Sequence, residues 1–248
     1  MSPSVERLYS RHAVRECLRA RRRTIHRLLF AEGIEDAPII REIRTLAQQQ
    51  GVPIHTVKRD ALNAISPHAQ GVALEVSSYP YVDLDAIFAE AVTQGNPPFI
   101  LILDSLQDPQ NLGSLIRTAE AAGLHGIVIG KRRSVEVTPA VVNASSGAAE
   151  HMRVAQVVNL ARTVEAVKAR DVWVVALHGD AQRTIYDADL RGALALIVGS
   201  EGEGVSRLLR DKADLLLRLP MRGRVASLNA AVAGAVAMYE ALRQREEG

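Results

Sequence analysis

The chain has 248 residues, of which 48% are hydrophobic and 4% aromatic, so its length allows one large or two modest domains and its composition excludes global disorder. The formal net charge is only +2, and Cys17 is the one cysteine, which excludes an internal disulfide and a CxxC metal motif. The first residues carry charges in place of an apolar signal sequence, and no apolar run reaches the ~18 residues of a membrane span. We therefore expect a cytoplasmic protein with no membrane partner.

Residues 10–22 predict a helix whose second face is rich in arginine. The apolar residues of this segment recur at helical spacing, and the arginines follow another face at three- or four-residue steps. Such a basic face suits a phosphate-bearing partner such as RNA, although an ordinary solvated helix face explains the pattern equally well. The side chains that would contact RNA are Arg11, His12, Arg15, Arg19 and Arg22.

Strand and helix patterns alternate from this helix to about Ser78, which predicts a small α/β domain over residues 1–78. Its further elements are expected at 25–33 (strand), 38–51 (helix), 52–57 (strand) and 71–78 (strand). A short helical pattern and a Gly-Asn-Pro-Pro breaker follow, so residues 79–97 are expected to be a linker.

The remaining residues, 98–248, predict a second α/β domain. Continuous apolar runs without alternation are typical of parallel strands that are buried on both faces. Such runs lie at 99–104, 126–130, 172–177, 193–199 and 214–220, with helical patterns at 111–123 and 226–244.

Three loops of this domain follow strand ends, where ligands bind in open parallel sheets. In the first loop, DSLQDPQNLG, Asn111 is a good N-cap for the next helix. Arg117 falls about 140° from Leu112 on that helix, so it points away from the core face. It is either an ordinary exposed arginine or one offered to RNA or to a partner subunit.

The second loop, GSEGEG, is glycine-rich but matches neither a P-loop nor a GxGxxG motif. Glu201 and Glu203 would repel phosphate but suit a cationic sulfonium or ribose hydroxyls, whereas a plain turn is an equally open reading. The scattered histidines lack partners at ligand spacing, and there is no GxSxG or HExxH motif, so we expect no metal site.

The third loop, PMRGRVASLN, precedes a last helix that is rich in Ala and Gly, so another segment could approach it closely. Ser227 is a natural N-cap for this helix. Its apolar face is expected to contain Leu228, Val232, Ala235, Tyr239 and Leu242, with Asn229 beside it.

In chain order, DPQNLGSLIRTAEAAG, IVGSEGEGVSRLL and LPMRGRVASLNAAVAGAVAMYEALR resemble the three signature motifs of the SpoU/TrmH (SPOUT) RNA 2′-O-ribose methyltransferases. LYSRHAVRECL and PHAQGVAL resemble the substrate-binding domain of the RlmB branch, which methylates a guanosine of 23S rRNA. The resemblance implies a knotted parallel-sheet methyltransferase domain with a deep C-terminal trefoil knot. It also implies a small α/β/α ribosomal-protein-like RNA-binding domain ahead of it, and a homodimer whose active site is completed across the interface.

The same resemblance implies S-adenosyl-L-methionine (AdoMet) as the consumed methyl donor and no metal. The residues that it places around AdoMet are Gly199, Leu219, Leu228, Met221, Leu177, His178 and Gly179. The residues that it places at the active site are Arg117, Asn111, Glu201, Ser227 and Asn229. Because the pKa of a free arginine exceeds ~12, we expect Arg117 to act by electrostatics and positioning, not as a base. The chain departs from the family at two positions. The family usually has glycine at the position of Ser10, and it often has lysine at the position of Asn143.

Three alternatives to 23S rRNA guanosine methylation stay open. One is a tRNA ribose methyltransferase on the same fold, against which the extended N-terminal domain argues. Another is a non-catalytic RNA-binding factor in ribosome assembly, against which the intact motif residues argue. The last is a resistance methyltransferase that acts on the same rRNA region.

Overall fold

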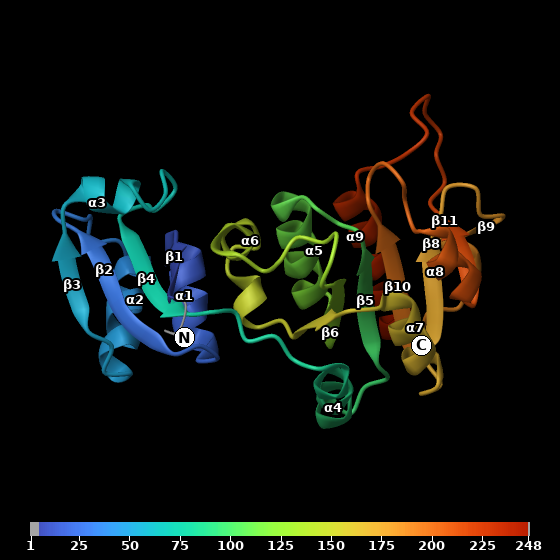
Figure 1. Ribbon diagram of the computed structural model, residues 1–248, viewed down its shortest axis with the longest axis horizontal. Coiled ribbons are helices and arrows are strands. Elements are labelled where there is room, and N and C mark those ends of the chain that lie inside the picture. Colours follow the sequence, from blue (N-terminus) through green and yellow to red (C-terminus); the bar gives the residue numbers. More distant parts are fainter. Residues whose placement is uncertain (1–4, 248) are drawn as a thin grey trace. The chain divides into compact units, whose positions relative to one another are not determined.

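The computed structural model describes residues 5–247, which form two compact units (Figure 1). The first unit runs to Pro80 and also contains Val137–His151, and the second contains Tyr81–Glu136 and the chain from Met152 onward. The inclusion of 137–151 in the first unit was not expected from the sequence. The predicted domain limits, with a linker at 79–97, stay a prediction.

The first unit is built on a four-stranded sheet in the order β1-β4-β2-β3. Strands β1, β4 and β2 pair in antiparallel fashion, and β2 pairs with β3 in parallel. The strands are β1 (Val5–Tyr9), β2 (Ile25–Ala31), β3 (Ile54–Val57) and β4 (Val72–Ser77). The helices are α1 (Arg11–Ala20), α2 (Pro38–Gln49), α3 (Arg59–Asn63), α6 (Pro139–Ala144) and the 3-10 turn η1 (Ala148–Glu150).

Burial shows why these segments form layers. Helix α1 buries Ala13, Val14, Cys17 and Leu18, the apolar positions that the sequence pattern indicated, and it packs beside α2. A separate cluster joins Leu62 of α3 to Leu29 and Ala73 of the sheet. Since successive side chains of a strand point to opposite faces, the sheet carries apolar residues on both of its faces.

A buried ion pair fastens η1 to the rest of the first unit. The Arg23 side chain is fully buried, and its Nε and Nη2 donate to the two carboxylate oxygens of Glu150 at 3.0 and 2.7 Å. Arg23 Nη1 also donates to Glu6 Oε2 at 2.7 Å. Burial lowers the pKa of Arg23, but the Glu150 carboxylate outweighs it, so the net pKa is raised and the guanidinium stays charged. Arg23 therefore has a structural role.

The second unit is a seven-stranded sheet in the order β7-β6-β5-β10-β8-β11-β9, and every pair in it is parallel. The strands are β5 (Phe99–Asp104), β6 (Gly126–Gly130), β7 (Val154–Val157), β8 (Trp173–Leu177), β9 (Arg183–Thr184), β10 (Leu194–Gly199) and β11 (Leu215–Arg218). The helices are α4 (Leu84–Gln94), α5 (Pro109–Ala121), α7 (Leu160–Lys168), α8 (Arg207–Lys212), α9 (Ala230–Glu247) and the 3-10 turn η2 (Ile185–Asp187). The parallel sheet that the apolar runs predict is confirmed.

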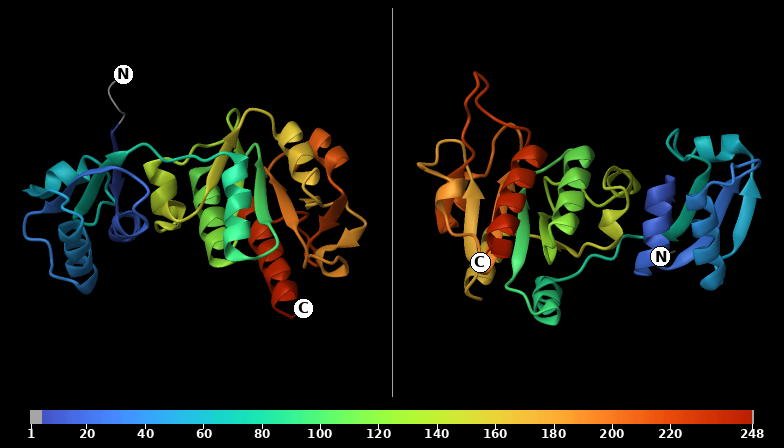
Figure 2. Two further views of the ribbon diagram at one scale, coloured as in Figure 1. Left: turned by 90° about the horizontal axis from the view of Figure 1, so that it is seen from below. Right: turned by 180° about the vertical axis from the view of Figure 1, so that it is seen from behind.

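Helices cover both faces of this sheet (Figure 2). Helices α4, α7 and α8 share one core cluster with β5 and β10, through residues such as Ile87, Ile102 and Ile197. Helices α5 and α9 pack together on the other face. A Cβ on Gly234 of α9 would lie 2.5 Å from Leu115 Cδ2 of α5 and 3.3 Å from Val198 Cγ2 of β10. The close approach that the Ala- and Gly-rich composition of the last helix predicted is therefore confirmed.

The order of the strands places the ligand loops together. Strand β10 lies between β5 and β8, although it comes after both in the sequence. The chain order thus reverses beside β5, and in open parallel sheets ligands bind at the carboxyl ends of strands at such a switch point. The loops after β5, β8, β10 and β11 all begin at this edge.

Candidate active site

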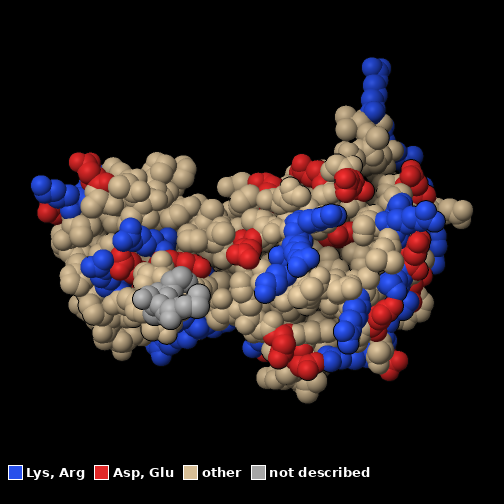
Figure 3. Space-filling view, viewed as in Figure 1, with Lys and Arg blue, Asp and Glu red and all other residues tan. Residues whose placement is uncertain are grey.

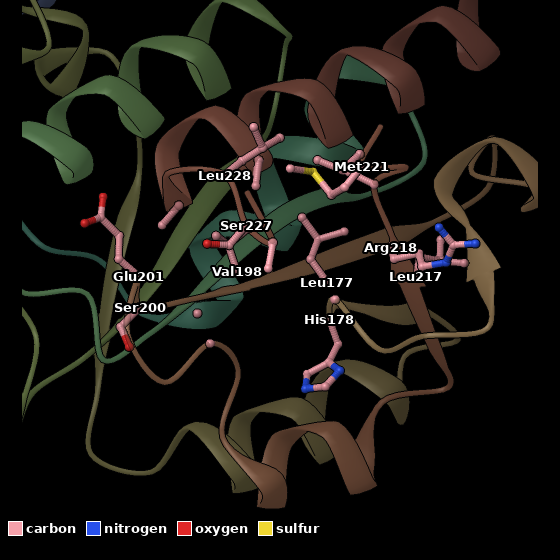
Figure 4. Close-up of a pocket in the computed structure, with 17 residues that line it drawn as sticks. Leu177, His178, Val198, Ser200, Glu201, Leu217, Arg218, Met221, Ser227 and Leu228 are labelled. Atoms are coloured by element: carbon pink, nitrogen blue, oxygen red, sulfur yellow. The ribbon is translucent and has the colours of Figure 1, made fainter. Parts of the chain in front are cut away.

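A cavity opens at the carboxyl ends of β8, β10 and β11, inside the second unit (Figure 4). Apolar side chains, polar groups and glycines line it together. All seven residues expected around AdoMet are among the lining residues, namely Leu177, His178, Gly179, Gly199, Leu219, Met221 and Leu228. Two of the expected active-site residues, Glu201 and Ser227, line it as well.

The side chains around the cavity differ in direction. In Figure 4, Leu177, Met221 and Leu228 lie around the cavity, whereas the imidazole of His178 is turned away from them. That ring contacts Arg210 through Nε2. His178 therefore contributes mainly its backbone, since its N–H donates to the Leu217 carbonyl at 2.9 Å and extends the pairing of β8 with β11.

Gly199 is needed where β10 turns into the GSEGEG loop. A Cβ on Gly199 would lie 2.0 Å from the carbonyl carbon of Gly204, so any side chain at this position would clash with the backbone. The loop folds back because the Gly204 N–H donates to the Ser200 carbonyl at 2.9 Å. Beyond the turn, the Ser206 N–H donates to Asp104 Oδ2 at 2.8 Å, which ties this loop to the end of β5.

A hydrogen-bonded trio of side chains joins three loops beside the cavity. Asn111 Nδ2 donates to Glu201 Oε1 at 2.9 Å, and Asn229 Nδ2 donates to Asn111 Oδ1 at 3.0 Å. Asn229 Nδ2 also contacts Glu201 Oε1. Glu201 and Asn229 follow Asn111 by 90 and 118 positions in the sequence, and the fold brings the three side chains together.

Two expected helix caps are wrong. The N-cap of α5 is Asp108, whose carboxylate accepts from the backbone N–H groups of Gln110 and Asn111. Helix α9 begins at Ala230, and Asn229 Oδ1 accepts from the N–H groups of Ala231 and Val232. The N-cap of α5 lies three residues before the expected Asn111, because proline fits the first turn of a helix and α5 therefore begins at Pro109. Ser227 is thereby left to the loop that lines the cavity.

A second hollow adjoins the first and shares Ser200 and Glu201 with it. It lies at the carboxyl ends of β5, β6 and β10, and Asn111 stands in its wall. Its lining is polar and mostly acidic, with Asp108, Glu201 and Glu203. The only arginine or lysine of its lining is Arg133.

Asn229 lines neither hollow, although it is hydrogen-bonded to Asn111 and Glu201, which do. Arg117 lines neither hollow either. It is exposed on α5, pointing away from the helix core as its spacing predicted.

The predicted apolar face of the last helix is wrong as a core face. Val232 and Tyr239 are 48% and 50% exposed, and Leu228 is 40% exposed ahead of the helix. The buried face of α9 contains Ala230, Ala231, Gly234, Ala237, Met238 and Ala241. The small residues form the core contact because α5 and β10 approach closely, so the larger apolar residues are left on the surface.

The N-terminal residues expected to bind RNA have protein partners in the first unit. Arg15 and Arg19 both form ion pairs with Glu16 and Glu42. Arg11 Nε donates to the Gln70 carbonyl at 3.3 Å, and Arg22 Nη1 donates to the Glu150 carbonyl at 3.2 Å. His12 is exposed and contacts Arg15 through Nδ1. Their role in RNA binding stays a prediction.

Ser10 has an unusual backbone conformation. Its φ and ψ are 73° and 148°, in a region that is almost restricted to glycine. This strain gives a physical reason for the glycine that the SpoU/TrmH resemblance leads one to expect at this position.

Within residues 5–247, no three His, Cys, Asp or Glu side chains are grouped so as to hold a metal ion. No helix in the same range is long and apolar enough to cross a membrane.

A cavity beside a polar hollow at the switch point of a parallel sheet is the usual position of a ligand site in α/β proteins. Comparison with known proteins shows the family of the chain.

Residues 98–239 match the model of the SpoU rRNA Methylase family, and residues 8–82 match that of RNA 2'-O ribose methyltransferase substrate binding. A Bacillus subtilis protein described as a putative TrmH family tRNA/rRNA methyltransferase, YacO, is 44% identical over 99% of this chain and 98% of its own length. The chain therefore belongs to the SpoU rRNA Methylase family of RNA 2′-O-ribose methyltransferases.

Solved structures share the fold. The SpoU methyltransferase AviRb from Streptomyces viridochromogenes, in complex with AdoMet, covers 98% of this chain and 92% of its own, with a TM-score of 0.83 and 24% identity. An AdoMet-bound rRNA methyltransferase from Sinorhizobium meliloti covers 96% of this chain and 87% of its own, with a TM-score of 0.77 and 24% identity. A structure that concerns 2-OH methylation of C/U34 on tRNA covers only 60% of this chain but 97% of its own, with a TM-score of 0.54 and 30% identity.

Proposed function

We propose that this chain transfers the methyl group of AdoMet to the 2′-hydroxyl of a guanosine ribose in 23S rRNA. The observation that carries the reaction is the hydrogen-bonded trio of Asn111, Glu201 and Asn229, in which Glu201 lines both the cavity and the polar hollow. Two adjoining sites with one shared carboxylate are what a transfer between two bound ligands needs, because proximity and orientation supply much of the rate.

The cavity fits AdoMet in its chemistry. Leu177, Met221 and Leu228 offer apolar contact for an adenine ring, and Ser200 and Ser227 offer hydroxyls. Gly179 has no heavy atom within 4 Å of the position of a Cβ, so the space beside this lining residue is open. Gly199 and Leu219 complete the set with His178, mainly through their backbones.

AdoMet, when bound, supplies an electrophilic methyl group: the O2′–C bond forms as the S–C bond breaks and the hydroxyl proton leaves. The protein has to align the hydroxyl and accept charge or a proton. Glu201 suits the first task, because the Asn111 and Asn229 amides both bond to its Oε1 and hold the carboxylate in one orientation. Its Oε2 has no hydrogen bond within residues 5–247 and can accept from a ribose hydroxyl. Ser227 lines the same cavity as Glu201.

We further propose that the enzyme is a homodimer and that Arg117 acts across its interface. Val232 and Tyr239 lie seven residues apart on one face of α9 and are about half exposed, which supports burial of this face against a second copy. Arg117 lies outside both hollows of its own chain, as a residue that serves a partner's site would. There its guanidinium would stabilise the developing alkoxide or hold a neighbouring phosphate.

The N-terminal unit supports rRNA over tRNA as the substrate. The structure that concerns tRNA methylation matches 60% of this chain, whereas the Sinorhizobium meliloti rRNA methyltransferase matches 96%. In this chain, residues 8–82 match a model of RNA 2'-O ribose methyltransferase substrate binding. We also propose that the enzyme acts in the cytoplasm and that the C-terminal part of its methyltransferase domain forms a trefoil knot.

The proposal is tested by tritiated methyl transfer from AdoMet to large-subunit rRNA, small-subunit rRNA and tRNA in parallel, each stripped of protein. Label on a single guanosine of large-subunit rRNA is the expected result. Label on tRNA alone would overturn the substrate while leaving the reaction. AdoMet binding without transfer to any RNA, including an assembling large subunit, would favour a non-catalytic assembly factor.

A further inference from the structure

Three consecutive basic residues follow β6 and have no partner. Lys131, Arg132 and Arg133 are all exposed, and their side chains make no hydrogen bond or ion pair within residues 5–247. Many basic residues of the second unit are paired instead, among them Arg153 with Glu90, Arg170 with Asp85 and Lys212 with Glu165. Figure 3 shows the same trend, since many blue side chains lie directly beside red ones. The unpaired triplet is therefore a local concentration of uncompensated positive charge.

The triplet is held at the edge of the polar hollow. The Val135 N–H donates to the Leu106 carbonyl at 2.8 Å, which fastens the loop after β6 to the loop after β5. Arg133 has a left-handed backbone, with a φ of 59°, and lines the hollow that also contains Asn111 and Glu201. Arg133 is thus both a member of the basic triplet and a wall of the hollow next to the cofactor cavity.

We propose that residues 131–133 form a phosphate clamp for the substrate RNA and that Arg133 pairs with the backbone phosphate next to the accepting ribose. The inference rests on the proposed function and adds a positioning residue to it. An arginine fits a phosphate in bidentate geometry, and phosphate contacts fix the register of a nucleic acid on its protein.

The charges of the hollow fix the direction of the bound nucleotide. Asp108, Glu201 and Glu203 make the other wall acidic, so a phosphate is repelled there and attracted to Arg133. A ribose hydroxyl has no charge and can approach Glu201, which also lines the cofactor cavity. With its phosphate on Arg133, the nucleotide therefore presents its ribose to the wall that the two hollows share.

The test compares Arg133→Ala and Arg133→Lys with the wild type in binding to large-subunit rRNA at several salt concentrations. Arg191→Ala is the matched control, because Arg191 is an exposed arginine of the same unit that precedes β10, at the opposite edge of the sheet. We expect Arg133→Ala to weaken RNA binding about ten-fold and to reduce the salt slope by about 0.7 to 1, the value of one phosphate contact. Arg133→Lys should retain the slope, and AdoMet affinity should be unchanged in all variants.

A second experiment locates the phosphate. Once the target ribose is mapped, a short RNA that carries one neutral methylphosphonate beside it is compared with the unmodified RNA. The neutral linkage should raise the KM of the wild type about ten-fold and have no further effect on Arg133→Ala, since both changes remove the same contact. Additive effects, or a salt slope that Arg133→Ala leaves unchanged, would overturn the inference. The wild type could show no methyl transfer while Arg133→Ala still reduced the salt slope of RNA binding. This outcome would overturn the proposed reaction and keep the phosphate contact.

Discussion

Replacing Glu150 by glutamine removes the main partner of a fully buried arginine. The Arg23 side chain is 0% exposed and that of Glu150 is 1% exposed, so neither group can be rescued by water. Of the four hydrogen bonds that Arg23 donates to Glu150, Glu6 and the Ser77 carbonyl, two go to Glu150. Breaking a buried pair costs about 3–5 kcal/mol, and the remaining Glu6 contact places Glu150→Gln near the lower end, about 3 kcal/mol.

Cys17 offers a direct assay of this loss. It is the one cysteine, it is fully buried in α1, and burial followed by the nearby Glu150 carboxylate raises the pKa of its thiol well above the usual range. Labelling of the thiol by a reagent at neutral pH therefore requires opening of the first unit. A cost of ~3 kcal/mol predicts a labelling rate that rises about 100-fold in Glu150→Gln.

Glu6→Gln is the matched control for this prediction. The Glu6 side chain is 24% exposed, so its pair with Arg23 is partly screened and the labelling rate should rise by less than about ten-fold. Labelling of both variants in urea corrects for intrinsic thiol reactivity. A rise below three-fold in Glu150→Gln would contradict the prediction, because the pair would then contribute no more to stability than a surface ion pair does.

Three further changes test the packing and the electrostatics. Ser10→Gly should stabilise the first unit by about 1 kcal/mol, seen as slower Cys17 labelling, because glycine adopts the observed φ of 73° without strain; faster labelling would contradict this. Gly234→Val should lower the thermal midpoint by overpacking against Leu115, at a cost of about 1–3 kcal/mol, and an unchanged midpoint would show that α5 yields freely. The urea midpoint should fall between pH 7 and pH 5, and His125→Gln should flatten this fall.

The pH prediction for His125 depends on the sign of its shift. Burial first, and then Arg245, lower the pKa of His125 below its ordinary 6.5, and its Nδ1 accepts from the Phe99 N–H at 2.9 Å. The unfolded chain therefore binds a proton at a higher pH than the folded chain. The contribution of neutral His125 to the free energy of unfolding is fully present above about pH 6.5, and it is lost as the pH falls from there toward the lowered pKa. An equal slope in wild type and His125→Gln would assign the loss to other groups.

Long apolar strands were predictable because burial on both faces leaves an unbroken pattern. Strands β5 (Phe99–Asp104) and β6 (Gly126–Gly130) lie where the sequence placed them. Short or polar elements gave no such signal, among them β1, α3, α6 and α8. The assignment of residues 137–151 to the first unit reflects long-range contacts that no local pattern encodes, among them the packing of α6 on β1 and the pair of Arg23 with Glu150.

The site was predictable as a set of residues but not in its geometry. The motif resemblance indicated Asn111, Glu201 and Asn229, whereas only the insertion of β10 between β5 and β8 makes them neighbours. Asn229 serves as a helix cap as well, so the capping role expected of Ser227 was assigned to the wrong residue. The sequence did not predict a role for Arg133, because a sequence does not show which basic side chains are left without a partner in the fold.

The proposed reaction places the methyl group on a ribose hydroxyl. The most direct test is mass spectrometry of nucleosides from large-subunit rRNA that has been incubated with the enzyme and AdoMet bearing a deuterated methyl group. We predict one deuterated product, 2′-O-methylguanosine, with the label on the sugar fragment. A deuterated methyl group on the base fragment would contradict the account, because the trio at Glu201 would then have been assigned to the wrong reaction.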